Sequence, residues 1–343
     1  MIEQVIGRLA VLGPAAFVAF LLGLGLTVLL RPSLARHAMA APNARSSHQE
    51  ATPQGGGIAV VAATLAVAWG AIALLPSLAA NQNGQFVALT AAAGLLAVVG
   101  AIDDMRPLPA TVRLALQCVA VGSVIAALPA ELRILPQAPW WLERAGLLLG
   151  GVWLVNLVNF MDGIDWMTVA EFVPVTGAIV LLGVAGAIDM LPALVAAVLF
   201  GAVLGFAPFN KPVAKLFLGD VGSLPIGLLL GWLLLQLAGN GHLVAALILP
   251  LYYVADATIT LARRAANRER VWQAHRTHFY QRATNNGFSV SEIVARVVAV
   301  NLALVALALI SVAASSVFVS SATLATAIAA VAWLLATFAR GRR

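Results

Sequence analysis

Charged residues are scarce in this chain of 343 residues: Asp, Glu, Lys and Arg together make up 10% of it, whereas hydrophobic residues make up 62%. The mean hydropathy is +0.96, which excludes an ordinary soluble globular protein. Low-complexity tracts, a soluble domain and internal repeats are absent from the sequence. The composition predicts an all-α, polytopic integral membrane protein that forms a single transmembrane domain over residues 1–343.

Cysteine is almost as scarce, because Cys118 is the only one and it lies within an apolar run. A disulfide and a thiolate metal site are therefore excluded, and the redox compartment cannot be deduced.

The apolar runs predict about eleven transmembrane helices, because a helix needs about 20 apolar residues to cross the hydrocarbon core. The first run is expected to remain as a helix, since it is long, lacks a basic n-region and has no small-residue cleavage site. Residues 172–207 carry one charge, Asp189. We interpret them as two spans, because a re-entrant segment there would invert everything that follows. The predicted spans are 10–30, 56–76, 85–102, 112–130, 144–160, 172–188, 191–207, 222–238, 243–262, 292–314 and 318–338.

The basic residues predict the orientation, because short cytoplasmic loops collect Lys and Arg. An N-terminus outside and a cytoplasmic C-terminus place fifteen of the 20 Lys and Arg residues inside. This rule, with affinity for anionic lipid or phosphate, explains the net charge of +6 without a nucleic-acid partner. The predicted cytoplasmic loops lie near 31–55, 103–111, 161–171, 208–221 and 263–291.

Acidic residues interrupt the apolar runs at three places that this topology puts on one membrane face: at Asp103 and Asp104, at Asp220, and at Asp162 and Asp165. Asp103 and Asp104 end the third span, where two carboxylates oppose the helix dipole and a cation would stabilise them. Asp220 stands between glycines just before the eighth span, which suits a metal-bound phosphate. Simpler interpretations are a solvated helix end for the pair and an ordinary N-cap for Asp220 or Ser223.

A polar run closes the fifth span, where Asn156, Asn159, Asp162 and Asp165 follow one another at intervals of three residues. This spacing keeps neighbours on one helical face until Gly163 permits a turn, so the four side chains could hold a polar ligand. The alternative is that they only cap and turn the helix end.

Two further segments point to phosphate. His275, Arg276, His278 and Arg282 lie in the last large loop, and the two histidines would share a face if the segment were helical. Gly55 and Gly56 open the second span and could cradle phosphate through their amides. The alternatives are a basic loop on anionic headgroups and glycines that serve helix packing.

Together these motifs resemble the polyprenyl-phosphate N-acetylhexosamine-1-phosphate transferases, over almost the whole chain. TPQGGG is similar to the family's TPxxGGG, AIDD followed by PLPATVRL to its DD motif, and NLVNFMDGID to NxxNxxDGxDG. FLGDVGS is similar to GDxGS and AHRTHFYQR to the histidine-basic loop, and the spellings look most like the O-antigen-initiating branch.

The resemblance implies a Mg²⁺-dependent transfer, with Mn²⁺ as an alternative, from a UDP-N-acetylhexosamine to undecaprenyl phosphate at the bacterial cytoplasmic membrane. It implies Asp103 as the base and Asp104 as its metal- or phosphate-positioning partner. Direct attack and a phospho-aspartate intermediate both stay open, as do the sugar and a homodimeric state. The implied metal ligands are Asp220 and Asn159, and the implied substrate contacts are Asn156, Asp162, Asp165, His275, Arg276, His278, Arg282, Gly55 and Gly56.

Two positions depart from the family pattern. Trp166 stands where glycine is usual, which would crowd the nucleotide or sugar pocket, and Gln54 replaces a residue that is often basic. Asp256, near Arg263 and Arg264, is expected only to pair structurally. A transporter of a phosphorylated or cationic solute is the rival interpretation and predicts charges at mid-span. A non-catalytic lipid-binding scaffold is the third.

Overall fold

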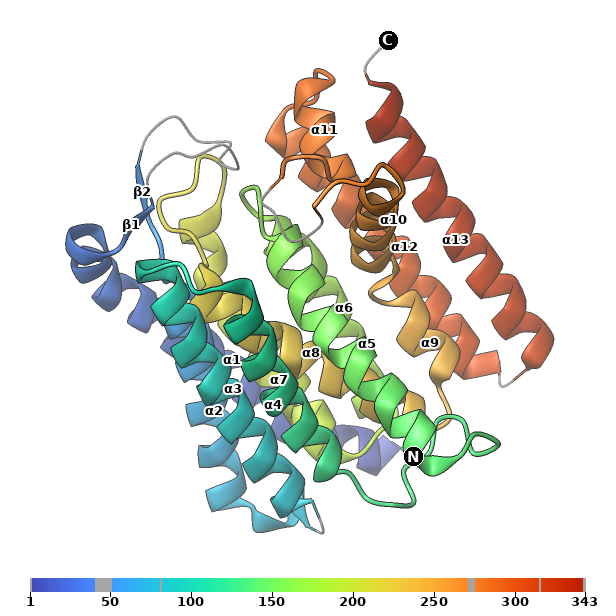
Figure 1. Cartoon of the computed structure of the whole chain (residues 1–343). Coiled ribbons are helices and arrows are strands. Elements are labelled where there is room, and N and C mark those ends of the chain that lie inside the picture. The colour runs from blue at the N-terminus through green and yellow to red at the C-terminus, as the bar shows by residue number, and fades with distance from the viewer. Residues whose placement is uncertain (1, 41–50, 81, 271–274, 315, 342–343) are drawn as a thin grey trace.

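The computed structural model describes residues 2–40, 51–80, 82–270, 275–314 and 316–341, and these form an almost entirely helical bundle (Figure 1). Nine helices in these ranges are long and apolar enough to cross a membrane. The all-α, multi-pass prediction is confirmed. In chain order the nine are α1 (Ile2–His37), α2 (Gly57–Leu74), α3 (Asn83–Met105), α5 (Trp140–Met161), α6 (Met167–Val184), α7 (Met190–Asn210), α8 (Asp220–Gly239), α12 (Val290–Ala314) and α13 (Val317–Arg340).

Two of the eleven predicted spans differ from the prediction. The fourth is α4 (Ala110–Ala126), a shorter apolar helix. The ninth is not one helix, because α9 (Leu243–Ile248) ends before Pro250 and α10 (Leu251–Ala266) begins after it. Proline has no N–H to continue the helical ladder. The two spans predicted over 172–207 are confirmed as α6 and α7.

The predicted loops contain more structure than expected. The first helix continues to His37 instead of ending near residue 30. Strands β1 (Met39–Ala40) and β2 (Thr52–Pro53) then pair antiparallel, which returns the chain to α2. The last large loop contains α11 (Phe279–Asn285), and a short 3₁₀ helix, η1 (Pro76–Ala79), lies between α2 and α3. Residues 41–50 and 271–274, which carry part of two predicted cytoplasmic loops, lie outside the described residues.

Helix α8 is the most buried of the nine and packs against α3, α5 and α2. Glycines permit this close packing. A Cβ atom on Gly57 would lie 2.1 Å from Gly222 Cα, and one on Gly100 would lie 2.2 Å from the Asp220 carbonyl oxygen. Small residues let membrane helices approach closely, because the backbones themselves are then in contact. The start of α8 is thereby held between α2 and α3.

The first turn of α1 and the last turn of α13 lie at opposite ends of the bundle (Figure 1). Strands β1 and β2, helix α11 and the end of α13 gather at one end. Asn286, just after α11, donates to the Phe338 carbonyl oxygen of α13 (2.7 Å), which ties these segments together. This end carries the polar motifs.

A buried carboxyl group joins α6 to α12. Asn301 on α12 donates through Nδ2 to Glu171 Oε2 (2.8 Å) and to the Ala170 carbonyl oxygen (2.8 Å). Both side chains are buried. Leaving a buried polar group without its hydrogen-bond partner lowers the free energy of unfolding by about 1–3 kcal/mol.

We therefore expect Asn301→Ala to lower the free energy of unfolding in detergent by about 1–3 kcal/mol. Thr326→Ala is the control, because its exposed hydroxyl bonds only to its own helix. Denaturant unfolding of both variants measures the difference, and equal stability of the two would contradict a stabilising role for the α6–α12 contact.

Candidate active site at one end of the bundle

The carboxylate of Asp104, at the end of α3, caps the start of α8. Its Oδ1 accepts from the Asp220 amide (3.0 Å) and its Oδ2 from the Val221 amide (3.1 Å). The first amides of a helix have no partner within the helix, and the helix dipole favours negative charge there. Gly219 is essential to this approach, since its φ is +76° and a Cβ atom would lie 2.6 Å from Asp104 Oδ2. Capping explains the position of Asp104, while its predicted catalytic role stays a prediction.

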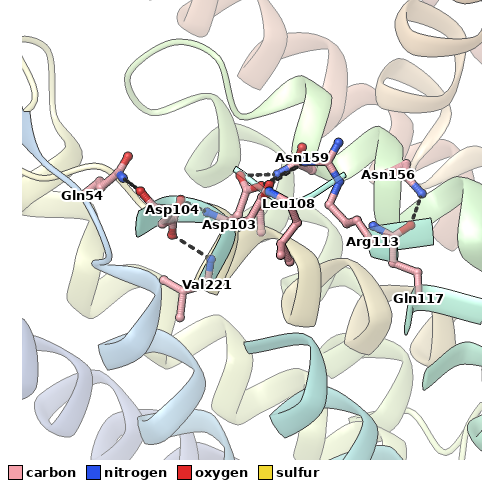
Figure 2. Close-up of polar contacts among 11 residues, drawn as sticks. Gln54, Asp103, Asp104, Leu108, Arg113, Gln117, Asn156, Asn159 and Val221 are labelled. Atoms are coloured by element: carbon pink, nitrogen blue, oxygen red, sulfur yellow. Dashed lines mark hydrogen bonds and ion pairs between the residues drawn. The ribbon is translucent and has the colours of Figure 1, made fainter. Parts of the chain in front are cut away.

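Asp103 is held by α4 and by the segment just before it. Its Oδ1 accepts from the Leu108 amide (2.6 Å) and its Oδ2 from Arg113 Nη1 (2.5 Å) (Figure 2). The same arginine nitrogen lies 3.9 Å from Asp220 Oδ2. Arg113 therefore places one positive charge between two carboxylates. The Asp103 side chain is 8% exposed and that of Asp220 is 26% exposed. Asp220 is thus the more accessible of the two.

Asn159 on α5 completes the contact with Asp220. Its Nδ2 donates to Asp220 Oδ1 (2.6 Å) and to Ser223 Oγ (2.9 Å). The ends of α3 and α5 and the start of α8 therefore meet, and the predicted convergence of Asp103, Asp104, Asn159 and Asp220 is found in the structure.

The other members of the polar run have partners elsewhere. Asn156 donates to Gln117 Oε1 on α4 (2.6 Å), to the side of the carboxylates in Figure 2. Asp165 is buried and accepts from the Ala214 amide in the loop before α8 (2.9 Å). One run of sequence thus bonds to several neighbouring elements: Asn156 and Asn159 do so from α5, and Asp165 does so after the helix has ended at Met161.

Asp162 follows α5 directly and accepts from Thr168 Oγ1 (2.5 Å). Burial raises the pKa of its carboxyl to about 7, and the charges of Asp104 and Asp165 add to the rise. Gly163 beside it is required for packing, since a Cβ atom there would lie 2.1 Å from the Tyr280 hydroxyl oxygen. That hydroxyl donates to the Phe160 carbonyl oxygen (2.9 Å). The segment from His275 to Arg282, called the histidine segment below, is therefore bonded to the end of α5.

Within that segment, His275 and His278 precede α11 and do not share a helical face as their spacing suggested. Their rings stack instead, with centroids 4.8 Å apart. Arg276 is half-buried and acts electrostatically on Tyr280. Arg282 lies over the Phe279 ring, at 5.9 Å from its centroid.

The glycine segment before α2 is paired with the loop before α8. The Gly56 amide donates to the Phe217 carbonyl oxygen (2.9 Å) and the Gly57 amide to that of Leu218 (2.8 Å). Gly55 has a φ of +102°, which favours glycine. Gln54 donates through Nε2 to the Asp104 carbonyl oxygen (2.9 Å). These contacts give the glycines a packing role, and their predicted contact with phosphate stays a prediction.

Trp166 adopts a left-handed conformation, with φ at 61°. Its amide donates to Asn210 Oδ1 (2.8 Å) and its indole Nε1 to the Ala207 carbonyl oxygen (2.7 Å). A left-handed residue other than glycine costs roughly 1–2 kcal/mol, and these two bonds to α7 offset that strain. The conformation explains why glycine suits this position in the pattern noted above.

Sequence reasoning gave no role to Arg113 or Gln117. They stand four residues apart and thus on one face of α4. Arg113 also follows Asp103 by ten residues at the start of the next helix, which is the signal that could have identified it.

A metal site in this region would use few protein ligands. Within the described ranges, no group of three or more His, Cys, Asp or Glu side chains is close enough to hold a metal ion. Mg²⁺ usually takes only one or two protein carboxylates together with water and phosphate oxygens. The partly exposed Asp220 offers carboxylate oxygens of the kind that Mg²⁺ prefers, and Asn159 would bind the ion through its amide oxygen, since its Nδ2 donates to Asp220.

The raised pKa of Asp162 gives a test by pH. Its carboxyl ionises near pH 3.8 in its ordinary state and near 7 in the folded protein, so between these values the folded state binds the additional proton. As the pH rises through this window, ionisation favours the unfolded chain. We expect the stability of the wild type to fall relative to Asp162→Asn between pH 4 and 7. Unfolding at several pH values measures this, and a constant difference would contradict it.

Comparison with known proteins adds an independent observation. Residues 86–238 match the glycosyl transferase family 4 model. The chain is 31% identical to a phospho-N-acetylmuramoyl-pentapeptide-transferase of Deinococcus radiodurans, over 66% of this chain and 74% of that protein.

Two further relatives cover similar shares. A probable undecaprenyl-phosphate N-acetylglucosaminyl 1-phosphate transferase of Bacillus subtilis is 24% identical, over 79% of this chain and 78% of the relative. An undecaprenyl-phosphate alpha-N-acetylglucosaminyl 1-phosphate transferase of Yersinia pestis is 29% identical, over 72% and 70%. The matched region contains Asp103, Asp104, Asn159 and Asp220.

Proposed function

This chain belongs to the polyprenyl-phosphate N-acetylhexosamine-1-phosphate transferases of glycosyl transferase family 4, and we propose that its donor is a UDP-N-acetylhexosamine and its acceptor undecaprenyl phosphate. It transfers a sugar-1-phosphate to a polyprenyl phosphate. The proposed products are UMP and a lipid-linked sugar diphosphate that starts a cell-surface glycan such as O-antigen. The proposed location is the bacterial cytoplasmic membrane, with the site on its cytoplasmic side, which the distribution of basic residues supports.

The meeting of Asp103, Asp104, Asn159 and Asp220 at the helix ends carries this proposal. Phosphoryl transfer depends mainly on positioning and on neutralising charge. The transporter interpretation required these charges at mid-span, whereas Asp103 and Asp104 end α3 and Asp220 begins α8.

Asp220 and Asn159 would hold Mg²⁺. Asp220 is suited to this because its side chain is partly exposed and its Oδ2 lies 3.9 Å from Arg113, beyond hydrogen-bond distance. The bound ion would neutralise the charge of the diphosphate. Arg113 then balances the charge of Asp103 and keeps it beside the site.

Asp103 is the proposed base for the lipid phosphate. Each carboxylate oxygen has two lone pairs, so each oxygen retains an acceptor site after binding the Leu108 amide or Arg113. Arg276, His275, His278 and Arg282 would bind the diphosphate, and Asn156, Asp162 and Asp165 would fix the geometry of the pocket.

The class of reaction and the donor can be tested together. Purified protein is incubated with undecaprenyl phosphate, Mg²⁺ and a panel of UDP-sugars, and UMP and the lipid product are measured. We expect one or more UDP-N-acetylhexosamines to yield both products. No UMP from any UDP-sugar, in protein that is folded, would reject the proposed donor class.

Asp220→Asn should lower the rate of UMP release by about 10²–10³-fold, the loss that follows removal of one preorganised electrostatic group. Asp189→Asn is the matched control, because Asp189 precedes α7 at the other end of the bundle and contacts Gln82. Equal activity of the two variants would remove Asp220 from the site.

Asp103→Asn tests the base. A phosphate monoester has a second pKa of about 6, so at higher pH the acceptor is already deprotonated and needs no base. We expect the activity deficit of this variant to shrink as the pH rises from 6 to 8. A deficit that is constant over this range would mean that Asp103 only positions Arg113.

A further inference from the structure

Asp256 is a fully buried carboxyl group on α10 that the proposed chemistry does not use. Its Oδ1 accepts from the Phe279 amide (2.9 Å) and its Oδ2 from the Tyr280 amide (3.1 Å). His278 Nδ1 lies 3.3 Å from the same Oδ1. Three consecutive residues of the histidine segment therefore meet on one side chain.

These contacts assign the proton on the His278 ring. An ionised carboxylate only accepts hydrogen bonds, and a carboxyl group buried in this way needs donors. Beside an ionised Asp256, Nδ1 of His278 is the nitrogen that donates to Oδ1, whether the ring is neutral or charged. Nε2, the nitrogen on the other side of the ring, is then the one turned away from Asp256.

The ring of His278 also supports its neighbours. It stacks on His275 at 4.8 Å and on Tyr280 at 5.8 Å between centroids, and Phe160 of α5 lies 6.3 Å away. The His278 side chain is 3% exposed. A change in its orientation would therefore move the more exposed His275 as well.

We propose that Asp256 is a positioning residue that holds His278 with Nδ1 protonated and Nε2 directed to the diphosphate, and thereby fixes the His275–His278 stack. The role toward the diphosphate rests on the proposed function, whereas the Asp256–His278 contact does not. The sequence led us to expect that Asp256 pairs with Arg263 or Arg264, but its partners are in the histidine segment. Arg263 instead donates to the Thr277 carbonyl oxygen (2.8 Å), and Arg264 pairs with Glu269 (2.7 Å).

The first test needs no activity. In ¹⁵N-histidine-labelled wild-type protein in lipid, the nitrogen chemical shifts of His278 are identified by their absence in His278→Gln. We expect a protonated Nδ1. An unprotonated Nδ1 would overturn the proposal even if the wild type is fully active, and this result does not depend on whether UMP is released.

The second test is a double-mutant cycle on UMP release with Asp256→Asn, His278→Gln and both together. Loss of the carboxylate that orients a metal-binding histidine typically costs about 10–100-fold; we expect a loss of this order here, in KM for the UDP-sugar more than in kcat. The double variant should release UMP no more slowly than the less active of the two single variants. Losses that multiply would show that the two residues act independently and would overturn the proposal.

Thr260→Val is the matched control, because Thr260 Oγ1 also bonds to Asp256 Oδ1 (3.3 Å), from the same helix as Asp256 and not from the segment that contains His278. We expect this variant to change KM by less than about twofold, since it removes one weak hydrogen bond to Asp256 and leaves the carboxylate itself in place. If Asp256→Asn does not fold, the wild-type nitrogen shifts decide the question. A loss in Thr260→Val equal to that in His278→Gln would contradict a specific effect through the imidazole.

Discussion

The site depends on the carboxylate of Asp104, which binds the first two amides of α8 from the end of α3. Both the amides and the carboxylate are stabilised, because a helix N-terminus carries partial positive charge and unsatisfied donors. The contact places Asp103, the residue before Asp104, beside Asp220, the residue whose amide is capped. It also requires glycine at position 219, where a side chain would collide with the carboxylate. This contact adds directed hydrogen bonds to the close packing of α3 against the start of α8 at Gly100.

Negative charge accumulates around this contact and is balanced in different ways. The carboxylate of Asp103 accepts a hydrogen bond from an arginine, and that of Asp220 from an asparagine. Asp104 accepts from two backbone amides and Asp165 from one. Asp162 has a threonine hydroxyl, and burial raises the pKa of its carboxyl to about 7. A cation bound here would reduce the repulsion among these carboxylates.

The fold was largely predictable, because hydropathy is a local property and long apolar runs in a membrane must form helices. The exceptions had local and non-local causes. Pro250 divides the ninth predicted span. The proline was visible in the sequence, but the span was predicted from the hydropathy of the whole run. In the polar run, equal spacing predicted one shared face, but Asn156, Asn159 and Asp165 bind α4, α8 and the loop before α8. The spacing of residues tells which side of their own helix they lie on, but it does not tell which neighbouring elements lie against that side.

The sequence by itself determined that this is a multi-pass helical protein, that its acidic motifs lie at helix ends and that its histidine motif lies in a loop, since all three follow from which residues interrupt the apolar runs. Only the tertiary structure decided which carboxylate caps a helix, which one holds Arg113 and which one is accessible. It also decided that Asp256 serves the histidine segment instead of the neighbouring arginines. The physical reason is that hydrogen bonds depend on distance and direction in space, and the residues that satisfy Asp104 are 116 and 117 positions away in the chain.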